Sequence, residues 1–136
     1  MKVKLNSILL VDDNPATNLI HERVISKVFP IDNLHVCTSG EQALELITGT
    51  EGNEHTQPQL IFLDINMPGM SGWDFIEEYE QLPDSQKGGI IIVMLTTSIN
   101  PDDKLKADSL KSISGFLNKP LTVDVIKSVI EEHFVV

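Results

Sequence analysis

The chain has 136 residues, a formal net charge of −10 and one cysteine. This length, with 41 % apolar residues, predicts a single soluble globular domain with a sizeable core. The acidic excess argues against direct binding to nucleic acid or an anionic membrane, since both require clustered positive charge. The longest apolar run, residues 90–95, is too short to span a bilayer. A lone Cys37 and the lack of a signal-peptide pattern favour the cytoplasm.

The first predicted unit is a strand over 7–11 followed by a helix over about 14–30. Asn is a favourable N-cap, proline at the first helical position loses no needed N–H, and a later proline ends the helix. The apolar residues of this helix recur at helical spacing and predict its buried face: Leu19, Ile20, Val24, Ile25 and Val28. A second strand over 34–38 and a helix over about 39–49 follow.

The middle of the chain predicts two more strands. Residues 49–58 lack periodicity and indicate an exposed loop, after which 59–63 form a strand. A turn-rich segment then leads to Ser71, which can cap a third helix. A second loop over 84–89 precedes the apolar run at 90–95, which reads as a strand buried on both faces.

The last two units complete the pattern. Asn100-Pro101 opens a helix with a thin apolar face, residues 115–117 form a very short strand, and Thr122 caps the final helix. Five strand–helix repeats predict an α/β protein with a doubly wound, five-stranded parallel sheet.

Polar residues cluster where the predicted strands end: Asp12, Asp13, Asp64, Thr96 and Lys119. Because the carboxyl ends of parallel strands share one edge of the sheet, these residues predict one site. Three carboxylates there would repel each other and favour a hard divalent cation, and the expected ion is Mg²⁺. A nearby lysine and hydroxyl suit a transferred phosphoryl group, and the nucleophile would be a carboxylate. A cis bond before Pro120 is one way to fix the lysine loop.

Each of these residues has an ordinary reading when taken alone. A single acidic residue at a strand end is usually a helix cap or a solvated charge, and Lys-Pro is a weak signal. The four histidines have no zinc-ligand spacing and are expected to be surface or packing residues: His21, His35, His55 and His133. The site is predicted because all the features coincide at one edge.

At this point the chain resembles the receiver domain of two-component response regulators, from about residue 6 to 133. The motifs that carry the resemblance are Ile-Leu-Leu-Val-Asp-Asp-Asn (8–14), Leu-Asp-Ile-Asn-Met-Pro-Gly-Met-Ser-Gly (63–72), Leu-Thr-Thr (95–97) and Phe-Leu-Asn-Lys-Pro (116–120). It implies a flavodoxin-like (βα)5 fold with strand order 2-1-3-4-5. The chain is expected to be one receiver domain over 1–136 with no output domain, either as a stand-alone receiver or as a part of a larger protein.

The resemblance assigns roles in the acidic site. Asp64 matches the phosphoacceptor, which would carry an aspartyl phosphate. Asp13 and Asp64 match direct Mg²⁺ ligands, and the backbone carbonyl of Asn66 matches a third. Asp12 matches the acid that reaches the ion through water. Lys119 matches the lysine that pairs with the phosphoryl group.

The resemblance also implies a switch. Thr96 matches the hydroxyl that moves toward the phosphoryl group, and Phe116 matches the aromatic residue whose rotamer follows it. Many members have tyrosine at the position of Phe116, so this aromatic ring is expected to stay buried. Thr97 stands where a small residue is common and lies beside the expected phosphoryl pocket.

The implied partners are a histidine kinase or histidine phosphotransfer protein and an unknown downstream protein target. The domain would catalyse its own phosphorylation and dephosphorylation without being a turnover enzyme. Asn66 and Ser98 flank the site and are expected to set the hydrolysis rate. Partner specificity is expected near Pro120 and on the first helix, around three residues: Asn14, Pro15 and Asn18.

Three other function classes compete with this interpretation. A phosphohydrolase working through an aspartyl phosphate needs a second acid two positions after the nucleophile, where this chain has Asn66. An interaction module without phosphorylation would lack one or more of the acids, the threonine or the lysine. A nucleotide- or flavin-binding domain would have a glycine-rich loop after the first strand, where this chain has Asp-Asp-Asn-Pro (12–15).

Overall fold

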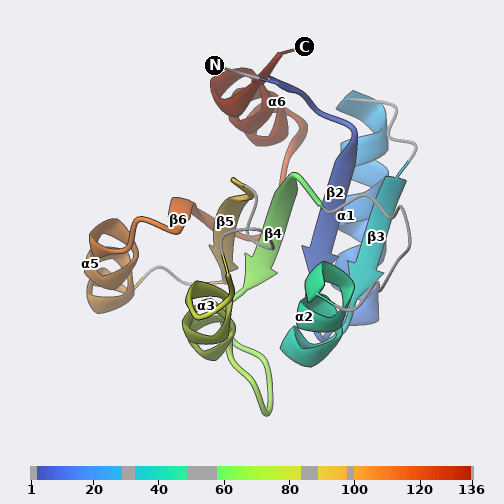
Figure 1. Ribbon diagram of the computed structural model, residues 1–136. Helices are drawn as coiled ribbons and strands as arrows, with labels where there is room; N and C mark the ends of the chain where they lie inside the picture. Colours follow the sequence, from blue (N-terminus) through green and yellow to red (C-terminus); the bar gives the residue numbers. More distant parts are fainter. Residues whose placement is uncertain (1–2, 29–32, 49–57, 84–88, 98–99, 136) are drawn as a thin grey trace.

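A five-stranded parallel sheet forms the centre of the protein, with strand order β3-β2-β4-β5-β6 (Figure 1). The structure, a computed structural model, describes residues 3–28, 33–48, 58–83, 89–97 and 100–135. The strands are β2 (Ser7–Val11), β3 (Asn33–Cys37), β4 (Leu60–Asp64), β5 (Ile91–Thr96) and β6 (Ile113–Asn118). Numbered by their order in the chain, these strands lie 2-1-3-4-5, so the predicted fold class is confirmed.

The predicted strands agree with the structure to within one residue at each end, except for the last. Residues 115–117 were expected as a very short strand, whereas β6 has six residues, Ile113–Asn118. This strand lies at the sheet edge and, within the described part of the chain, pairs only with β5, with a register shift near Ile92. Because an edge strand is not buried on both faces, it accommodates polar residues that broke the apolar pattern in the sequence.

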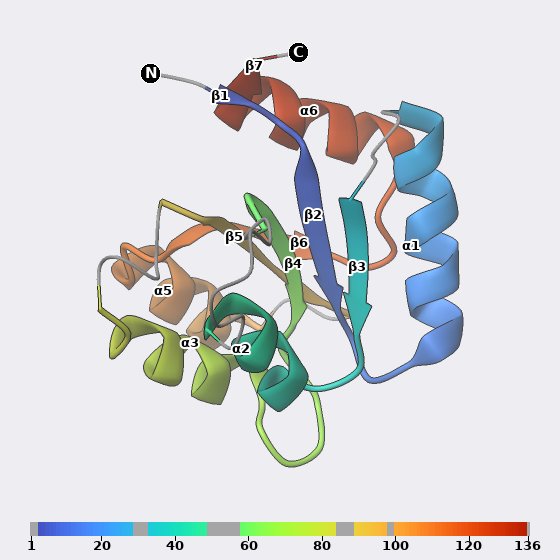
Figure 2. The same cartoon turned by 45° about the vertical axis from the view of Figure 1, so that its right-hand side comes forward.

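Helices cover both faces of the sheet (Figure 2). The helices α1 (Pro15–Val28) and α6 (Val123–His133) contribute to one core cluster together with strand residues such as Leu10 and Phe62. The helices α2 (Gly40–Thr48), α3 (Gly72–Glu80) and α5 (Pro101–Ser109) contribute to the other cluster. The two layers hold the strand ends in a fixed frame.

Side-chain caps begin α3, α5 and α6 where the sequence predicted them, and Asn14 Oδ1 likewise accepts the Ala16 N–H at 2.9 Å before α1. Ser71 and Asp74 form a capping box: Ser71 Oγ accepts the Asp74 N–H at 3.2 Å, and Asp74 accepts the Ser71 N–H at 3.1 Å. Asn100 Oδ1 accepts the Asp102 N–H at 2.8 Å, and Thr122 caps α6. These caps fix where each helix leaves the edge that carries the polar residues.

The predicted buried face of α1 is only partly right: Ile25 is buried and Val24 and Val28 pack against the core, but the first turn differs. Leu19 and Ile20 are 48 % and 52 % exposed, whereas the buried positions of the helix are Asn18, His21 and Ile25. The apolar spacing failed only for the N-terminal half of the helix, where the two inward positions, 18 and 21, are polar. What those polar residues contact is described with the site below.

Two short strands were not expected. β1 (Val3–Lys4) and β7 (Phe134–Val135) pair in parallel, which places the two ends of the described chain side by side (Figures 1 and 2). Phe134 is buried in the same cluster as α1 and α6.

The α5 helix buries only Ala107, as its thin apolar face indicated. The predicted loops at 49–58 and 84–89 fall almost wholly outside the described residues. Among the residues that are described, no helix has the length and apolarity needed to cross a membrane.

Candidate functional site

Three carboxylates converge at the carboxyl edge of the sheet. Asp12 directly follows β2, Asp13 is next to it, and Asp64 is the last residue of β4. One ligand atom from each lies within 4.8 Å of the others, with Asp12 and Asp64 buried and Asp13 exposed. The predicted convergence of these acids is therefore observed.

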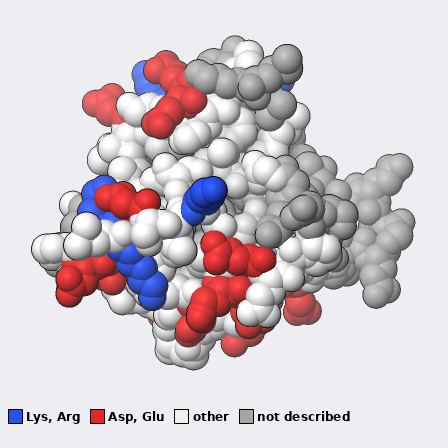
Figure 3. Space-filling view, turned by 60° about the vertical axis from the view of Figure 1, so that its left-hand side comes forward, with Lys and Arg blue, Asp and Glu red and all other residues white. Residues whose placement is uncertain are grey.

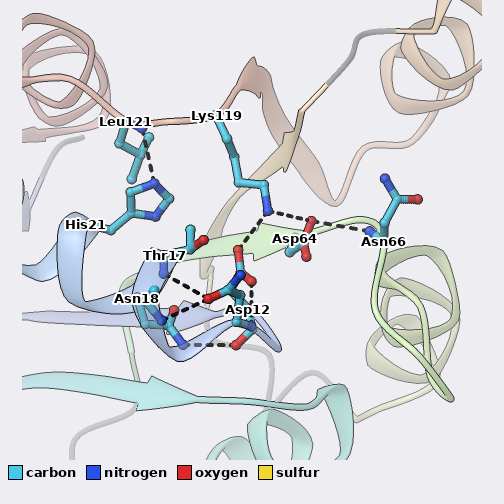
Figure 4. Close-up of polar contacts among 10 residues, drawn as sticks. Asp12, Thr17, Asn18, His21, Asp64, Asn66, Lys119 and Leu121 are labelled. Carbon is cyan, nitrogen blue, oxygen red and sulfur yellow. Dashed lines mark hydrogen bonds and ion pairs between the residues drawn. The ribbon is translucent and has the colours of Figure 1, made fainter.

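The ammonium group of Lys119 reaches into this cluster from the loop after β6 (Figure 4). Its Nζ donates to Asp12 Oδ2 at 2.9 Å and lies 3.3 Å from Asp64 Oδ1. All three side chains are largely buried, with the lysine side chain 11 % exposed. The Lys119–Pro120 peptide bond is cis.

The charges in this cluster do not balance. Burial raises the pKa of Asp64, the negative charge of Asp12 raises it further, and Lys119 only partly opposes them. Burial by itself would lower the pKa of Lys119, but the hydrogen bond to Asp12 and the charges of Asp64 and Asp12 raise it above its usual value. One ammonium thus faces several carboxylates, and the site favours additional positive charge.

Hydrogen bonds fix the strand ends that carry the acids. Asn14 N–H donates to Asp12 Oδ1 at 2.9 Å, and Asn18 Nδ2 donates to the Asp12 carbonyl at 2.9 Å. Asn66 N–H donates to Asp64 Oδ1 at 3.3 Å. Asn18 is only 2 % exposed, so its expected place on a partner-binding surface is wrong: it supports Asp12 from inside. Asn14 and Pro15 are exposed, as expected.

The predicted switch residues lie next to this cluster. Thr96 ends β5 and is 2 % exposed, and its carbonyl accepts the Lys119 N–H at 2.7 Å. Phe116 lies opposite Met94 in the β5–β6 ladder, two residues along from the pairing of Thr96 with Asn118. Its ring is buried, as expected, with 9 % exposed. Thr97 is exposed beside the site, and Ser98 lies outside the described residues.

His21 is a site residue that the sequence interpretation missed. It is 1 % exposed, and its Nε2 accepts the Leu121 N–H at 3.2 Å (Figure 4). Burial lowers the pKa of His21, an effect that the charge of Asp12 opposes and that of Lys119 reinforces. The sequence feature that could have indicated its burial is its spacing: His21 lies three residues after Asn18 and four before Ile25, on one helical face.

Taken together, these residues form a mostly buried cluster of oxygen atoms with one ammonium group. Carboxylate oxygens at such spacing are suitable ligands for a hard divalent cation. A carboxylate with a nearby ammonium is also suited to receive a phosphoryl group, whose oxygens need positive charge.

Comparison with known proteins agrees with this chemistry. The family model described as the response regulator receiver domain matches residues 8–131. The chain belongs to the response regulator receiver domain family. Receiver domains of this family are components of two-component systems, so the resemblance carried by the sequence motifs is confirmed.

Individual response regulators show the same relationship. The receiver chain is 33 % identical over 114 residues to the response regulator Rcp1 of Synechocystis, covering 82 % of this chain and 75 % of Rcp1. A two-component response regulator from Cytophaga hutchinsonii superposes with a TM-score of 0.85 at 28 % identity, covering 95 % of this chain and 96 % of that one. A Legionella pneumophila regulator superposes with a TM-score of 0.79 at 32 % identity, covering 93 % and 96 %. Some other curated relatives are longer, and the chain spans 26 % and 48 % of two of them.

Proposed function

We propose that this receiver accepts a phosphoryl group from a phosphohistidine donor onto Asp64, with Mg²⁺ bound, and thereby switches a protein-interaction surface. The observation that carries the proposal is the placement of Asp64 against Asp12, Asp13 and the Lys119 ammonium in one pocket. Each of these residues also matches a position of the receiver motifs. The donor would be a histidine kinase or a histidine phosphotransfer protein.

In the transfer step an Asp64 carboxylate oxygen attacks phosphorus and the phosphorus–nitrogen bond of the donor histidine breaks. The histidine nitrogen leaves with the electron pair, and the product is an acyl phosphate on Asp64. Lys119 Nζ lies 3.3 Å from Asp64 Oδ1 and would pair with a phosphoryl oxygen there. Phosphorylation adds about −1.5 to −2 charge to an already acidic pocket, so this lysine is required to offset it.

The residues present fit a magnesium ion. The acids Asp12, Asp13 and Asp64 offer only oxygen donors, and the carbonyl of Asn66 would complete the protein ligands. Bound there, Mg²⁺ would neutralise charge on the carboxylates and on the phosphoryl oxygens. Asp13, the exposed acid of the three, is open to a hydrated ion.

The proposed switch runs from Thr96 to Phe116. After phosphorylation the Thr96 hydroxyl would donate a hydrogen bond to a phosphoryl oxygen, and the space that it leaves would admit the Phe116 ring. Phe116 borders a cavity of about 240 Å³ between α5 and β6, with Lys104 and Ala107 among the lining residues. The readout surface would be formed by α5, β6 and α6, and its partner would be another protein.

The same pocket would also return the domain to its resting state by hydrolysis of the acyl phosphate. The exposed side chain of Asn66, two residues after Asp64, would influence how water reaches the phosphorus. Acidic side chains gather in several groups on the face shown in Figure 3, in line with the net charge of −10. This charge supports a protein partner in the cytoplasm over nucleic acid or a membrane surface.

The test is incubation of the purified protein with Mg²⁺ and acetyl phosphate, followed by intact mass measurement. Asp64→Asn removes the acceptor, and Asp108→Asn serves as the matched control because Asp108 is exposed on α5. A phosphate adduct is expected on the wild type and on the control. No adduct is expected on Asp64→Asn, or on any of the proteins in EDTA. If the wild type neither gains phosphate nor binds beryllofluoride, the alternative is an interaction module that works without phosphorylation.

A further inference from the structure

The loop that carries Lys119 is held from two sides. On one side, Lys119 N–H donates to the Thr96 carbonyl at 2.7 Å. On the other, Leu121 N–H donates to His21 Nε2 at 3.2 Å. Pro120 between them has no N–H to donate. The His21 bond is therefore the backbone anchor on the far side of the lysine, and it comes from a different element, α1.

The same face of α1 binds the backbone beside both partners of the Asp12–Lys119 ion pair. Asn18 holds the Asp12 carbonyl, and one turn later His21 holds the residue two positions after Lys119. In Figure 4 the Asn18 side chain points toward Asp12 and the His21 ring points toward Leu121. One helical turn thus fixes the position of Asp12 relative to Lys119, whose Nζ donates to Asp12 Oδ2 at 2.9 Å.

The chemistry of the ring suits this task. Because Nε2 accepts a hydrogen bond, the ring is neutral and carries its proton on Nδ1. A neutral acceptor leaves the charge balance around Lys119 unchanged, which an acidic side chain would not. His21 also lines a cleft of about 210 Å³ that includes Lys119 and Pro120. The ring therefore supports the loop at the border of the site without entering the carboxylate cluster.

We propose that His21 is a positioning residue that holds Lys119 within reach of Asp64, and so sets how fast Asp64 accepts a phosphoryl group. This inference rests on the proposed function. It predicts that the hydrogen-bond acceptor at Nε2 matters more than the size of the side chain.

The test compares His21→Met with His21→Gln. The two replacements have nearly the same length, but only Gln offers an acceptor near the position of Nε2. The rate of phosphate incorporation from acetyl phosphate with Mg²⁺ is measured by intact mass for each. His21→Met is expected to be slower than the wild type by about tenfold, since it leaves the Leu121 N–H unpaired. His21→Gln is expected to recover most of the loss.

A second comparison separates positioning from general damage. In a Lys119→Ala background, His21→Met is expected to slow the reaction less than twofold, because a residue that acts through Lys119 has nothing left to position.

The affinity of His21→Met for Mg²⁺, measured calorimetrically, is expected to stay within about twofold of the wild type, since His21 makes no hydrogen bond to the carboxylates in the described structure. If His21→Met does not fold, His21→Asn takes its place, because its shorter amide does not reach the Nε2 position.

The outcomes distinguish the inference from the proposal on which it rests. A wild type that takes up phosphate, with His21→Met equally fast, overturns the role of His21 and leaves the proposed function standing. Equal defects in the Met and Gln variants, or an undiminished effect in the Lys119→Ala background, also overturn it. A wild type that takes up no phosphate and binds no beryllofluoride overturns both.

Discussion

Gly72, the first residue of α3, lies against the backbone of the phosphoacceptor. A Cβ added there would stand 2.8 Å from the Asp64 carbonyl oxygen, 2.8 Å from Ile65 Cα and 3.0 Å from Met94 Cε. The Gly72 N–H also donates to the Ile65 carbonyl at 2.8 Å, so the two segments cannot separate without losing this bond. We expect Gly72→Ala to destabilise the fold and to displace Asp64.

The size of the effect follows from these contacts. Ordinary van der Waals contact for a Cβ begins near 3.4 Å, so the backbone of β4 must move by about half an ångström. Overpacking of this kind costs about 2 kcal/mol, and the better helix propensity of alanine offsets only part of that at the first helical position. For 136 residues, 2 kcal/mol corresponds to a fall in Tm of about 7 °C. A shift of the acceptor carboxylate should slow phosphorylation by about tenfold or more.

Thermal unfolding and phosphate uptake from acetyl phosphate measure the two effects. Gly115→Ala is the matched control, because its added Cβ would meet Val93 at 3.4 Å, an ordinary contact distance. This control is expected to unfold within about 3 °C of the wild type. A Gly72→Ala protein as stable and as active as Gly115→Ala would refute the reasoning, since the backbone of β4 would then have yielded at no cost.

Four other predictions concern buried groups. Asp64→Asn should raise stability in EDTA by about 1–2 kcal/mol, because burial and the charge of Asp12 disfavour the ionised Asp64; equal thermal midpoints would contradict this. Burial raises the pKa of Cys37 to about 11, so at pH 8 the folded thiol should react with Ellman's reagent about a hundredfold more slowly than the unfolded thiol. Because the unfolded thiol ionises at a lower pH than the folded thiol, the free energy of unfolding should fall as the pH rises from about 9 to 11. The Cys37→Ala variant should not show this fall in stability. Phe134→Ala should cost about 3 kcal/mol in urea unfolding, whereas Val135→Ala, at a half-exposed position, should stay within about 0.5 kcal/mol.

Much of the fold was predictable because strong local signals agreed with the global arrangement. Continuous apolar runs marked the buried strands, and the caps at Ser71, Asn100 and Thr122 marked the helix starts. The edge strand β6 was underestimated because it needs only one apolar face. The pairing of β1 with β7 joins segments more than a hundred residues apart, each of two residues, and such short strands leave no periodicity to read.

The carboxylate cluster was predictable for a topological reason. In a parallel sheet every strand ends on the same edge, so Asp12, Asp64 and Thr96 had to lie near each other once the strands were recognised. The support around them was not predictable in this way. Which face of α1 turns inward depends on tertiary packing, and the apolar spacing pointed to Leu19 and Ile20, which the structure leaves half exposed.

That failure has a physical meaning. Leu or Ile at positions 18 and 21 would satisfy the apolar pattern, yet the chain buries Asn18 and His21 there. Asn18 even leaves its Oδ1 without a hydrogen-bond partner among the described residues, a cost that an apolar residue would avoid. What each gains is one bond to the backbone beside the ion pair of Asp12 and Lys119. Both polar residues on this helical face bind the backbone next to the same ion pair, so their presence is best explained by the geometry that the ion pair requires.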